Sequence, residues 1–268
     1  MPLLIASDVD GTLLNPAERV TRRTAEVIRR ITESGKPFVL VTGRPPRWVP
    51  RVAEAAGVTG YAVCANGAAL YDIAADRVLR ARWLDPVLLN DLSAALTEVL
   101  PGCLLATERV GATATDDAGQ QFLAEPGYRH PWPNPDSTAT SRAAVLGRPA
   151  VKLLVRHSSM TSAEMALAAG AVVGDEVSVT YSSNSGLIEI TAADATKATG
   201  LAEVAELHGV PQVDVIAFGD MPNDVPMLRW AGHGVAVANA HPDAKAAADE
   251  VTGSNADDGV ALVLERWF

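Results

Sequence analysis

The sequence predicts an α/β protein, in which a doubly wound, Rossmann-like parallel sheet is interrupted by an inserted α+β domain. Two observations predict the sheet. Short apolar runs alternate with segments of helical periodicity, and the runs are apolar along their whole length, as strands covered on both faces are. A third observation predicts the insertion, because the middle of the chain mixes strands and helices without this alternation. We therefore expect residues 1–82 and 187–268 to form the core and residues 83–186 to form the inserted domain.

The first elements of the core are two strands with a helix between them. Leu3 to Ala6 is a short apolar run that stops before Asp8, which indicates a buried strand. Thr21 can cap a helix that Gly35 ends. The apolar face of this helix follows a spacing of three and four residues, at Thr24, Val27, Ile28 and Ile31. Phe38 to Val41 is the second apolar run and predicts the second strand.

The core continues beyond this strand and resumes near the C-terminal end of the chain. Tyr61 to Cys64 predicts a third strand, which ends at Asn66-Gly67. After the insertion, an apolar helix face formed by residues 201, 204 and 205 ends at Gly209. Two further strands are expected at Val213–Phe218 and Val235–Ala238.

The inserted domain is expected to contain two helices and three strands. The helices lie near residues 87–100 and 163–171, and the strands lie near 104–108, 151–156 and 177–181. The stretch at residues 130–135, His-Pro-Trp-Pro-Asn-Pro, predicts a loop by its composition.

Composition and charge exclude several classes of protein. Hydrophobic residues make up 48% and charged residues 20% of the 268, which is typical of a globular protein and not of a disordered one. The formal net charge is −10 and no long Lys/Arg run occurs, so we expect no nucleic-acid partner. Cys64 and Cys103 give neither a disulfide framework nor a metal-binding spacing. The apolar runs are shorter than the roughly 20 residues of a membrane helix, so we expect a cytoplasmic protein without a membrane partner.

Several polar residues stand where a predicted strand ends or a helix begins. Asp8 and Asp10 follow the first strand, and Thr42 follows the second. Asp220 follows a later strand, and Lys197 lies near the start of a helix. Open parallel sheets bind ligands beyond the carboxyl ends of their strands, near a switch in strand order. Strand packing alone does not require polar groups there, so we expect these side chains to converge on a ligand.

Convergence would bring up to four carboxylates into one crevice, those of Asp8, Asp10, Asp220 and Asp224. Carboxylates this close raise one another's pKa values unless a cation lies between them. A donor set made of oxygen, without His or Cys, favours a hard cation such as Mg²⁺. We therefore expect Mg²⁺ as the cofactor.

The other polar groups of this set suit an anionic ligand. Lys197 supplies a positive charge and Thr42 a hydroxyl group, and the loops around Gly11 and Gly43 supply backbone amides. Together with a divalent cation, this set is suited to a phosphoryl group.

These residues fall into four motifs that resemble those of the haloacid dehalogenase superfamily, in the same order. The motifs are Asp8-Val9-Asp10-Gly11-Thr12-Leu13-Leu14, Val41-Thr42-Gly43-Arg44, Lys197 and Gly219-Asp220-Met221-Pro222-Asn223-Asp224. More narrowly, the chain resembles the Cof-type phosphatases, which carry a large C2-type cap between the second and third motifs. The segments Ala65-Asn66-Gly67-Ala68 and Asn239-Ala240 are also similar to that subgroup.

The resemblance implies an enzyme that hydrolyses a small phosphorylated metabolite, with sugar phosphates as the expected substrates. Asp8 would attack phosphorus and form an aspartyl-phosphate. Asp10 would protonate the leaving oxygen and then deprotonate the attacking water. An ordinary Asp titrates near pH 3.9, so this role requires a raised pKa, for which we expect burial and carboxylate crowding to be the reason.

The resemblance also implies the ligands of the metal ion. The side chains of Asp8 and Asp220 and the backbone carbonyl of Asp10 would hold Mg²⁺. Asp224 would lie behind them or serve as an additional ligand.

The phosphoryl oxygens would be held by Thr42, Gly43, Lys197 and Asn223, which would stabilise the charge that shifts in the transition state. Arg44 and Asn66 are candidates for contacts with the substrate from the rim of the site, and local structural roles for both are equally open.

Three alternatives to a general sugar-phosphate phosphatase remain at this point. A phosphosugar mutase would share Asp8 and Asp10 but would depend on a bisphosphate sugar and release no free phosphate. A non-catalytic module would bind Mg²⁺ or phosphate without turnover. A narrower phosphatase would act on a flavin precursor or a phosphorylated glycoside. The sequence specifies neither the physiological substrate nor the oligomeric state.

Overall fold

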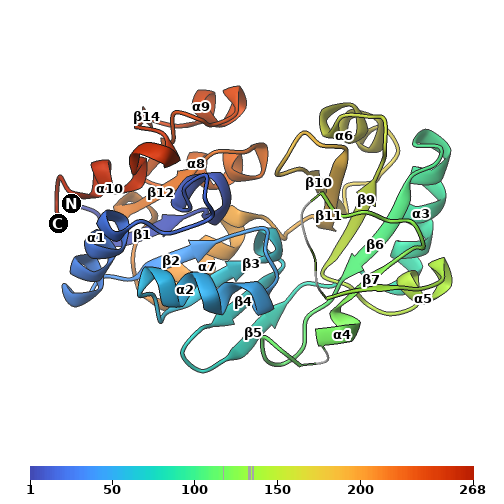
Figure 1. Cartoon of the computed structure of the whole chain (residues 1–268), viewed down its shortest axis with the longest axis horizontal. Coiled ribbons are helices and arrows are strands. Elements are labelled where there is room, and N and C mark those ends of the chain that lie inside the picture. Colours follow the sequence, from blue (N-terminus) through green and yellow to red (C-terminus); the bar gives the residue numbers. More distant parts are fainter. Residues whose placement is uncertain (117, 132–133, 135) are drawn as a thin grey trace.

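Two β-sheets organise the molecule, and each has its own helices (Figure 1). The computed structural model describes residues 1–116, 118–131, 134 and 136–268. One sheet has eight strands in the order β14-β13-β12-β1-β2-β3-β4-β5, and the other has six in the order β10-β11-β9-β6-β7-β8. In chain order, the larger sheet is formed first, interrupted by the smaller one, and then completed.

The eight-stranded sheet is parallel over six of its strands. These strands are β1 (Leu4–Ser7), β2 (Phe38–Val41), β3 (Tyr61–Cys64), β12 (Val215–Gly219), β13 (His233–Ala236) and β14 (Glu250–Val251). An antiparallel extension, β4 (Ala69–Asp72) and β5 (Arg77–Ala81), follows β3. The predicted doubly wound α/β class is confirmed, and the antiparallel extension is an addition that the sequence analysis did not foresee.

Alternation along β1 explains why helices cover both faces of this sheet. Ile5 packs on one face, where α1 (Arg22–Glu33), α2 (Val49–Ala56) and α10 (Gly259–Leu264) supply the apolar partners. Leu4 and Ala6 pack on the other face, under α7 (Lys197–Leu207) and α8 (Val225–Trp230). Helix α9 (Pro242–Ala247) packs beside α8. Both faces exclude water, which is why the central strands of this sheet are mostly apolar.

The six-stranded sheet is antiparallel except for one pair, β7 with β8. Its strands are β6 (Leu104–Glu108), β7 (Phe122–Ala124), β8 (Ser137–Ala139), β9 (Lys152–Arg156), β10 (Val177–Thr180) and β11 (Leu187–Ala192). Helices α3 (Pro86–Val99), α5 (Arg142–Leu146) and α6 (Ser162–Gly170) pack on one face, and the short α4 (Ala118–Gln121) precedes β7. The opposite face carries Glu108, Phe122, Lys152, Leu154 and Glu189, which line a cavity shared with the larger sheet.

One expected boundary is corrected by the strand pairing. Residues 187–192 were assigned to the core, but they form β11, which pairs with β9 and β10 in the six-stranded sheet. The physical reason is that Ile188 and Ile190 of this strand are buried in the apolar cluster of that sheet. We propose that the core resumes after Ala192, and the remainder of the expected division stays a prediction.

Two further details concern positions along the chain. The strand expected at Val235–Ala238 lies two residues earlier, as β13. The loop expected at residues 130–135 includes positions 132, 133 and 135, which lie outside the described residues.

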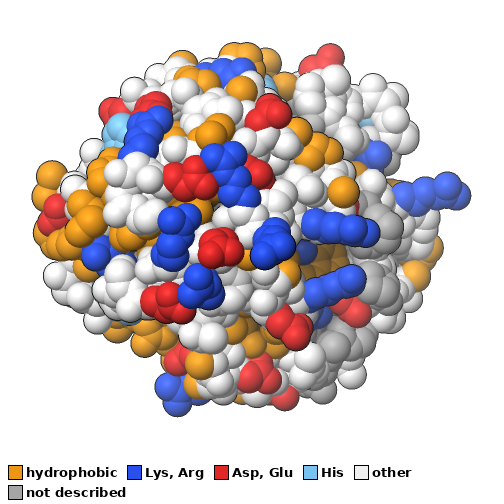
Figure 2. All heavy atoms as spheres, turned by 60° about the vertical axis from the view of Figure 1, so that its left-hand side comes forward, with side chains coloured by type: hydrophobic (Ala, Val, Ile, Leu, Met, Phe, Trp, Pro, Cys, Tyr) orange, Lys and Arg blue, Asp and Glu red, His pale blue; other side chains and the backbone are white. Residues whose placement is uncertain are grey.

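The surface and the helices add two observations. Figure 2 shows one face of the molecule, on which acidic and basic side chains are interspersed. In the part of the chain that the structure describes, no helix has the length and apolar character needed to cross a membrane.

Candidate active site

The centre of the site lies where β1 and β12 end side by side. These strands are parallel neighbours, with Ser7 opposite Phe218, so the residues that follow them emerge together. The backbone N–H of Asp8 donates to the carbonyl of Phe218 at 2.9 Å, which fixes Asp8 against the end of β12. The chain order reverses at β1, which has β2 on one side and β12 on the other. The site therefore lies at a topological switch point, as expected.

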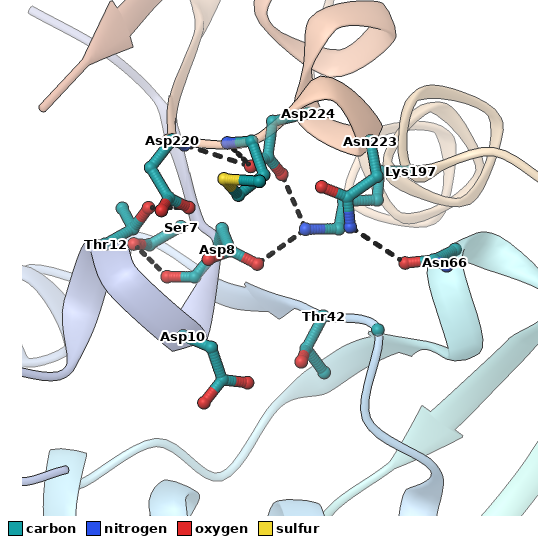
Figure 3. Close-up of polar contacts among 12 residues, drawn as sticks. Ser7, Asp8, Asp10, Thr12, Thr42, Asn66, Lys197, Asp220, Asn223 and Asp224 are labelled. Atoms are coloured by element: carbon teal, nitrogen blue, oxygen red, sulfur yellow. Dashed lines mark hydrogen bonds and ion pairs between the residues drawn. The ribbon is translucent and has the colours of Figure 1, made fainter. Parts of the chain in front are cut away.

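Lys197 joins two of the carboxylates. Its Nζ donates to Asp8 Oδ1 and to Asp224 Oδ1, both at 2.5 Å (Figure 3). Lys197 is the first residue of α7, and Thr196 caps that helix by accepting from the N–H of Thr199. Burial opposes the charge on Lys197, but Asp224 and Asp8 outweigh this effect and raise its pKa above the ordinary value. Lys197 is therefore a permanent cation at the centre of the site.

Asp224 organises the loop that follows β12. Its Oδ2 accepts from the backbone N–H groups of Asp220 and Met221, at 3.0 and 2.9 Å. A Cβ atom at position 219 would lie 2.5 Å from Asp224 Cβ, so this turn requires the glycine that is present. Asp224 thus holds Lys197 with one oxygen and the loop carrying Asp220 with the other.

Three buried carboxylates, those of Asp8, Asp220 and Asp224, come close enough to share one cation. Each can offer an oxygen within 4.8 Å of the others. Burial is the main cause of a raised pKa at Asp8, and burial followed by the charge of Asp224 raises the pKa of Asp220 to about 7. Thr12 Oγ1 donates to Asp220 Oδ1 at 3.1 Å. Asp8 Oδ2 is buried and has no hydrogen-bond partner among the described residues, which is the condition of an oxygen placed to bind a cation or to attack an electrophile.

The charge balance of this cluster fits a divalent cation. If all three carboxylates are ionised, they and the lysine sum to −2, and a buried charge of this size requires compensation. The donors are all oxygen, which suits Mg²⁺. Two observations therefore support a hard divalent cation here: the donor chemistry and the unpartnered oxygen of Asp8.

Asp10 is placed differently from the other three acids. Its side chain is 55% exposed and forms a bidentate ion pair with Arg44, at 2.5 and 2.8 Å. Figure 3 shows its carboxylate pointing away from the cluster. The expectation that Asp10 is buried is therefore wrong, because the glycine turn after it directs the side chain into the open cavity.

The loop after β2 contributes Thr42 and Gly43. Thr42 is fully buried, and its Oγ1 accepts from the backbone N–H of Arg44 at 3.0 Å. The carbonyl of Gly43 accepts from Lys152 Nζ at 2.8 Å. Gly43 and Arg44 line the cavity beside Asp8, whereas Thr42 lies behind them.

Asn66 and Asn223 contact each other beside the carboxylates. Asn223 Nδ2 donates to Asn66 Oδ1 at 3.1 Å, and Asn223 Oδ1 is buried and lacks a partner in the described part of the chain. Asn66 Nδ2 donates to Glu189 Oε2 at 3.1 Å. Because both polar ends of the Asn66 amide are engaged, this residue contacts the protein in this structure and does not line the cavity.

The cavity has a volume of about 500 Å³ and extends from Asp8 to the six-stranded sheet. Several side chains that line it escaped the sequence analysis: Trp48, Glu108, Phe122, His130, Lys152 and Glu189. Lys152 Nζ donates to Glu189 Oε1 at 2.5 Å, and both side chains are buried. Burial lowers the pKa of His130 to about 4, so its imidazole is neutral near pH 7. The usable signal was a charge inside an apolar strand, as in Val151-Lys152-Leu153 and Ile188-Glu189-Ile190.

A second set of contacts joins the two sheets across the cavity. Arg47 lies in the turn Pro46–Trp48 after β2, and it pairs with both oxygens of Glu108 at 2.6 and 3.1 Å. Its Nε also donates to Asp136 Oδ2 at 2.8 Å. Trp48 Nε1 donates to the same oxygen at 3.0 Å.

Comparison with known proteins matches this chain to one family over nearly its whole length. Residues 5–264 match the family model for haloacid dehalogenase-like hydrolases. The chain is 29% identical to the 5-amino-6-(5-phospho-D-ribitylamino)uracil phosphatase YitU of Bacillus subtilis strain 168, over all of this chain and 98% of the relative. It is 27% identical to the pyridoxal phosphate phosphatase YbhA of Escherichia coli K12, over 97% of each chain.

A solved structure supports the fold over the full length. A haloacid dehalogenase-like hydrolase from Bacteroides thetaiotaomicron superimposes with a TM-score of 0.78 at 25% identity, covering 100% of both chains. Sequence and structure comparisons therefore agree over nearly the whole chain, including the six-stranded sheet.

Proposed function

The chain belongs to the haloacid dehalogenase-like hydrolases, and we propose that Asp8 is the nucleophile with which it hydrolyses a small phosphorylated metabolite. It is a phosphatase of the Cof-type group, a hydrolase of phosphoric monoesters. The observation that carries the proposal for Asp8 is its environment. Lys197 holds one of its oxygens, and the other is buried without a partner among the described residues.

In the first step, an oxygen of Asp8 attacks phosphorus and the bond from phosphorus to the leaving oxygen breaks. The product is an aspartyl-phosphate on Asp8, and the leaving oxygen takes a proton from Asp10. Lys197, the Gly43 amide and Asn223 would bind the phosphoryl oxygens, with Thr42 supporting the loop from behind. Arg44 holds Asp10 at the cavity wall, so this ion pair has to loosen when Asp10 carries the proton.

In the second step, water attacks the phosphorus of the aspartyl-phosphate and Asp10 takes a proton from that water. The bond between phosphorus and Asp8 breaks, which releases inorganic phosphate and restores the carboxylate. Atoms and charges balance with water as the only co-substrate. The two steps share one acid/base residue, whose protonation state alternates between them.

We propose that Asp8 and Asp220 hold Mg²⁺ together with the backbone carbonyl of Asp10. Asp224 already holds Lys197 and two backbone amides, which favours a supporting role for it over direct ligation. When bound, the ion supplies positive charge close to the phosphoryl oxygens.

The charges of the cavity favour an uncharged leaving group. Of the described residues that line it, the Lys and Arg side chains are Arg44 and Lys152, and each is paired with an acid, Asp10 or Glu189. A second phosphate or a carboxylate on the substrate would find no unpaired cation among these side chains. Ser182 and Ser183, which also line the cavity, offer hydroxyl groups. We therefore propose a hydroxyl-bearing phosphomonoester such as a sugar or polyol phosphate.

The test is phosphate release from a panel of sugar, polyol and vitamin phosphomonoesters, with Mg²⁺ and with EDTA. We expect Mg²⁺-dependent release, and we expect Asp8→Asn to reduce kcat/KM by about a thousandfold or more because the nucleophile is lost. Asp91→Asn on the exposed face of α3 is the matched control and should leave the rate unchanged.

Two results would contradict the proposal. Full activity of the Asp8→Asn variant would exclude Asp8 as the nucleophile. Conversion of a sugar phosphate to its isomer, dependent on a bisphosphate and without release of phosphate, would identify a mutase instead.

A further inference from the structure

A chain of buried hydrogen bonds runs from the six-stranded sheet into the phosphate-binding part of the site. Lys152 Nζ donates to Glu189 Oε1 at 2.5 Å. Asn66 Nδ2 donates to Glu189 Oε2 at 3.1 Å, and Asn223 Nδ2 donates to Asn66 Oδ1 at 3.1 Å (Figure 3 shows this last link). All four side chains are buried. We call this chain of four residues the relay.

The relay has a direction that its chemistry enforces. An ionised carboxylate only accepts hydrogen bonds, so Asn66 must present its NH₂ group to Glu189. The carbonyl oxygen of Asn66 then faces Asn223, which must present its own NH₂ group in turn. The charge on Glu189 therefore decides which way both amides point. Neither amide could choose its orientation from its own chemistry, because Asn is both a donor and an acceptor.

Glu189 stays ionised in this environment. Burial opposes its charge, but Lys152 and the hydrogen bond from Asn66 outweigh this and hold the pKa of Glu189 below its ordinary value. The ammonium group of Lys152 can only donate hydrogen bonds, so the atom of residue 189 that faces it must be an acceptor oxygen.

We propose that Glu189 is a positioning residue that sets the orientation of Asn223, acting through Asn66, and thereby completes the phosphate-binding site. The inference rests on the proposed function, in which Asn223 binds the phosphoryl group. It changes the expected role of Asn66, from a contact with the substrate to the central member of the relay.

The relay also connects the two sheets, so the phosphate-binding site depends on how the sheets pack against each other. Asn66 and Asn223 follow strands of the eight-stranded sheet, whereas Lys152 and Glu189 lie on β9 and β11 of the six-stranded sheet. Lys152 Nζ additionally donates to the carbonyl of Gly43 in the phosphate-binding loop. If the sheets separate, Asn66 loses the carboxylate that orients it. The orientation of Asn223 is therefore fixed only while the six-stranded sheet is seated over the site.

The test exchanges donors and acceptors within the relay. In Glu189→Gln, Lys152 claims the amide oxygen, so the NH₂ group of Gln faces Asn66 and drives both Asn side chains to turn over. We expect kcat/KM to fall about tenfold to a hundredfold, since a displaced contact to the reacting group costs this much. Asn66→Asp alone places two carboxylates face to face and should lose activity as well.

The double variant Asn66→Asp with Glu189→Gln should recover activity. Here Gln donates to Asp at position 66, whose second oxygen accepts from Asn223, so Asn223 regains its original orientation. We expect at least about a tenfold gain over Glu189→Gln, as coupled neighbours show. The matched control is Glu108→Gln, another buried acid on the same sheet that pairs with Arg47. Asn66→Asp should bring no gain in that background.

Two outcomes would overturn the relay: a Glu189→Gln rate within about twofold of the wild type, or a double variant that combines the two losses additively. Circular dichroism and thermal unfolding establish that each variant is folded. Titration of each variant with inorganic phosphate in a calorimeter provides a readout that needs no turnover. If the wild type hydrolysed no substrate, the proposed function would fail, while the loss and recovery of phosphate affinity would still decide on the relay.

Discussion

Lys197 lies between two carboxylates that have different tasks. Asp8 faces the cavity and Asp224 faces the loop after β12, and the same ammonium group binds both at 2.5 Å. Its own helix places it there, because the first turn of α7 packs tightly on β3. A Cβ atom at Gly200 would lie 2.4 Å from a methyl carbon of Val63. The position of this cation is therefore set by the packing of the α7 backbone, and the Lys197 side chain is buried.

Replacement of Lys197 by Met should affect both the rate and the stability. The loss of one charge that stabilises the phosphoryl group should lower kcat by about a hundredfold to a thousandfold. Without the cation, three buried acids remain unbalanced, and we expect a loss of about 3–5 kcal/mol in the free energy of unfolding in EDTA. Addition of Mg²⁺ should recover part of this stability, because a divalent ion offsets the same carboxylates. Urea unfolding with and without Mg²⁺ measures the effect.

Lys245→Met, at a half-buried position in α9, is the control for the loss of a lysine and should change neither quantity. A Lys197→Met enzyme that turned over at the wild-type rate would show that this charge is not used in the reaction.

At the scale of single residues, the sequence predicted the polar residues that follow the strands of the parallel sheet, and it missed isolated charges within the strands of the other sheet. Asp8, Asp220 and Asp224 follow apolar strands, so their convergence followed from strand order. Lys152 and Glu189 lie on different strands of an antiparallel sheet, and each is an isolated charge within an apolar run. Their meaning appears only when the pairing of β9 with β11 brings them together. The exposure of Asp10 was not foreseen either, since it depends on the direction of one turn.

Among the structural elements, the turn after β1 requires glycine for two reasons, its backbone conformation and the lack of space for a side chain, whereas the end of α1 requires it for the first reason alone. Gly11 has a φ of 82°, and a Cβ atom there would lie 2.2 Å from Asp220 Oδ2. Gly35, after α1, has a similar φ of 77° but no heavy atom within 4 Å of the same position. The two glycines share one backbone conformation and differ in what surrounds them. Asn239 reinforces the first turn by donating to the carbonyl of Gly11.

Alanine at each of these glycines should therefore separate stability from activity. Both variants should lose about 1–2 kcal/mol of unfolding free energy, since alanine is strained at positive φ. Gly11→Ala should in addition displace the Asp220 carboxylate, raise the Mg²⁺ concentration for half-maximal activity and lower kcat by about a hundredfold. Gly35→Ala should keep wild-type kinetics. Thermal unfolding and a Mg²⁺ titration of the rate distinguish the two effects, and equal kinetics in both variants would contradict the assigned close approach.

Helices with clear apolar periodicity and strands with continuous apolar runs were predicted well. Strands that are recognised only by their hydrogen-bonded neighbours were not. Strands β2 and β3 and strand β6 begin and end where the apolar runs do, and Thr21 caps α1 as expected. The antiparallel strands β4 and β5 were missed. Strand β5 is largely exposed and carries Arg77 and Arg80, so its composition resembles a surface segment. Strand β11 was not predicted as a strand, and its residues were placed in the core, because the sequence of a strand does not specify which strands it pairs with.

At the scale of the whole molecule, two buried ion pairs take part in the contacts between the sheets. One is Lys152 with Glu189, both on the six-stranded sheet, from which Lys152 Nζ also donates to the carbonyl of Gly43 in the loop after β2. The other is Arg47 with Glu108, supported by Asp136 and Trp48. Burial raises the pKa of Glu108 although Arg47 acts in the opposite direction. The ionised state of Glu108 is therefore tolerated in the seated arrangement because Arg47 is present.

Arg47→Met should destabilise the protein in a manner that depends on pH. Without its partner, the buried Glu108 should have a still higher pKa. A carboxyl group with a raised pKa contributes stability below its unfolded pKa and loses it as the pH rises through the folded value. The loss relative to the wild type should therefore be small near pH 5 and reach about 3 kcal/mol near pH 8, where an unpaired buried charge would remain. Urea unfolding at the two pH values measures the difference.

The double variant Arg47→Met with Glu108→Gln tests whether Glu108 is the cause. Gln at position 108 has the same shape and no charge, so the extra loss at pH 8 should disappear while the packing change at position 47 remains. Lys152 and the backbone N–H of Arg109 also act on Glu108, and both are unchanged in the comparison. If the double variant kept the full pH-dependent loss, Glu108 would be excluded as its cause. If the loss vanished, the ionisation of Glu108 alone would account for the pH dependence of the unfolding free energy, and Arg47 would be the residue that lets this buried acid stay ionised between the two sheets.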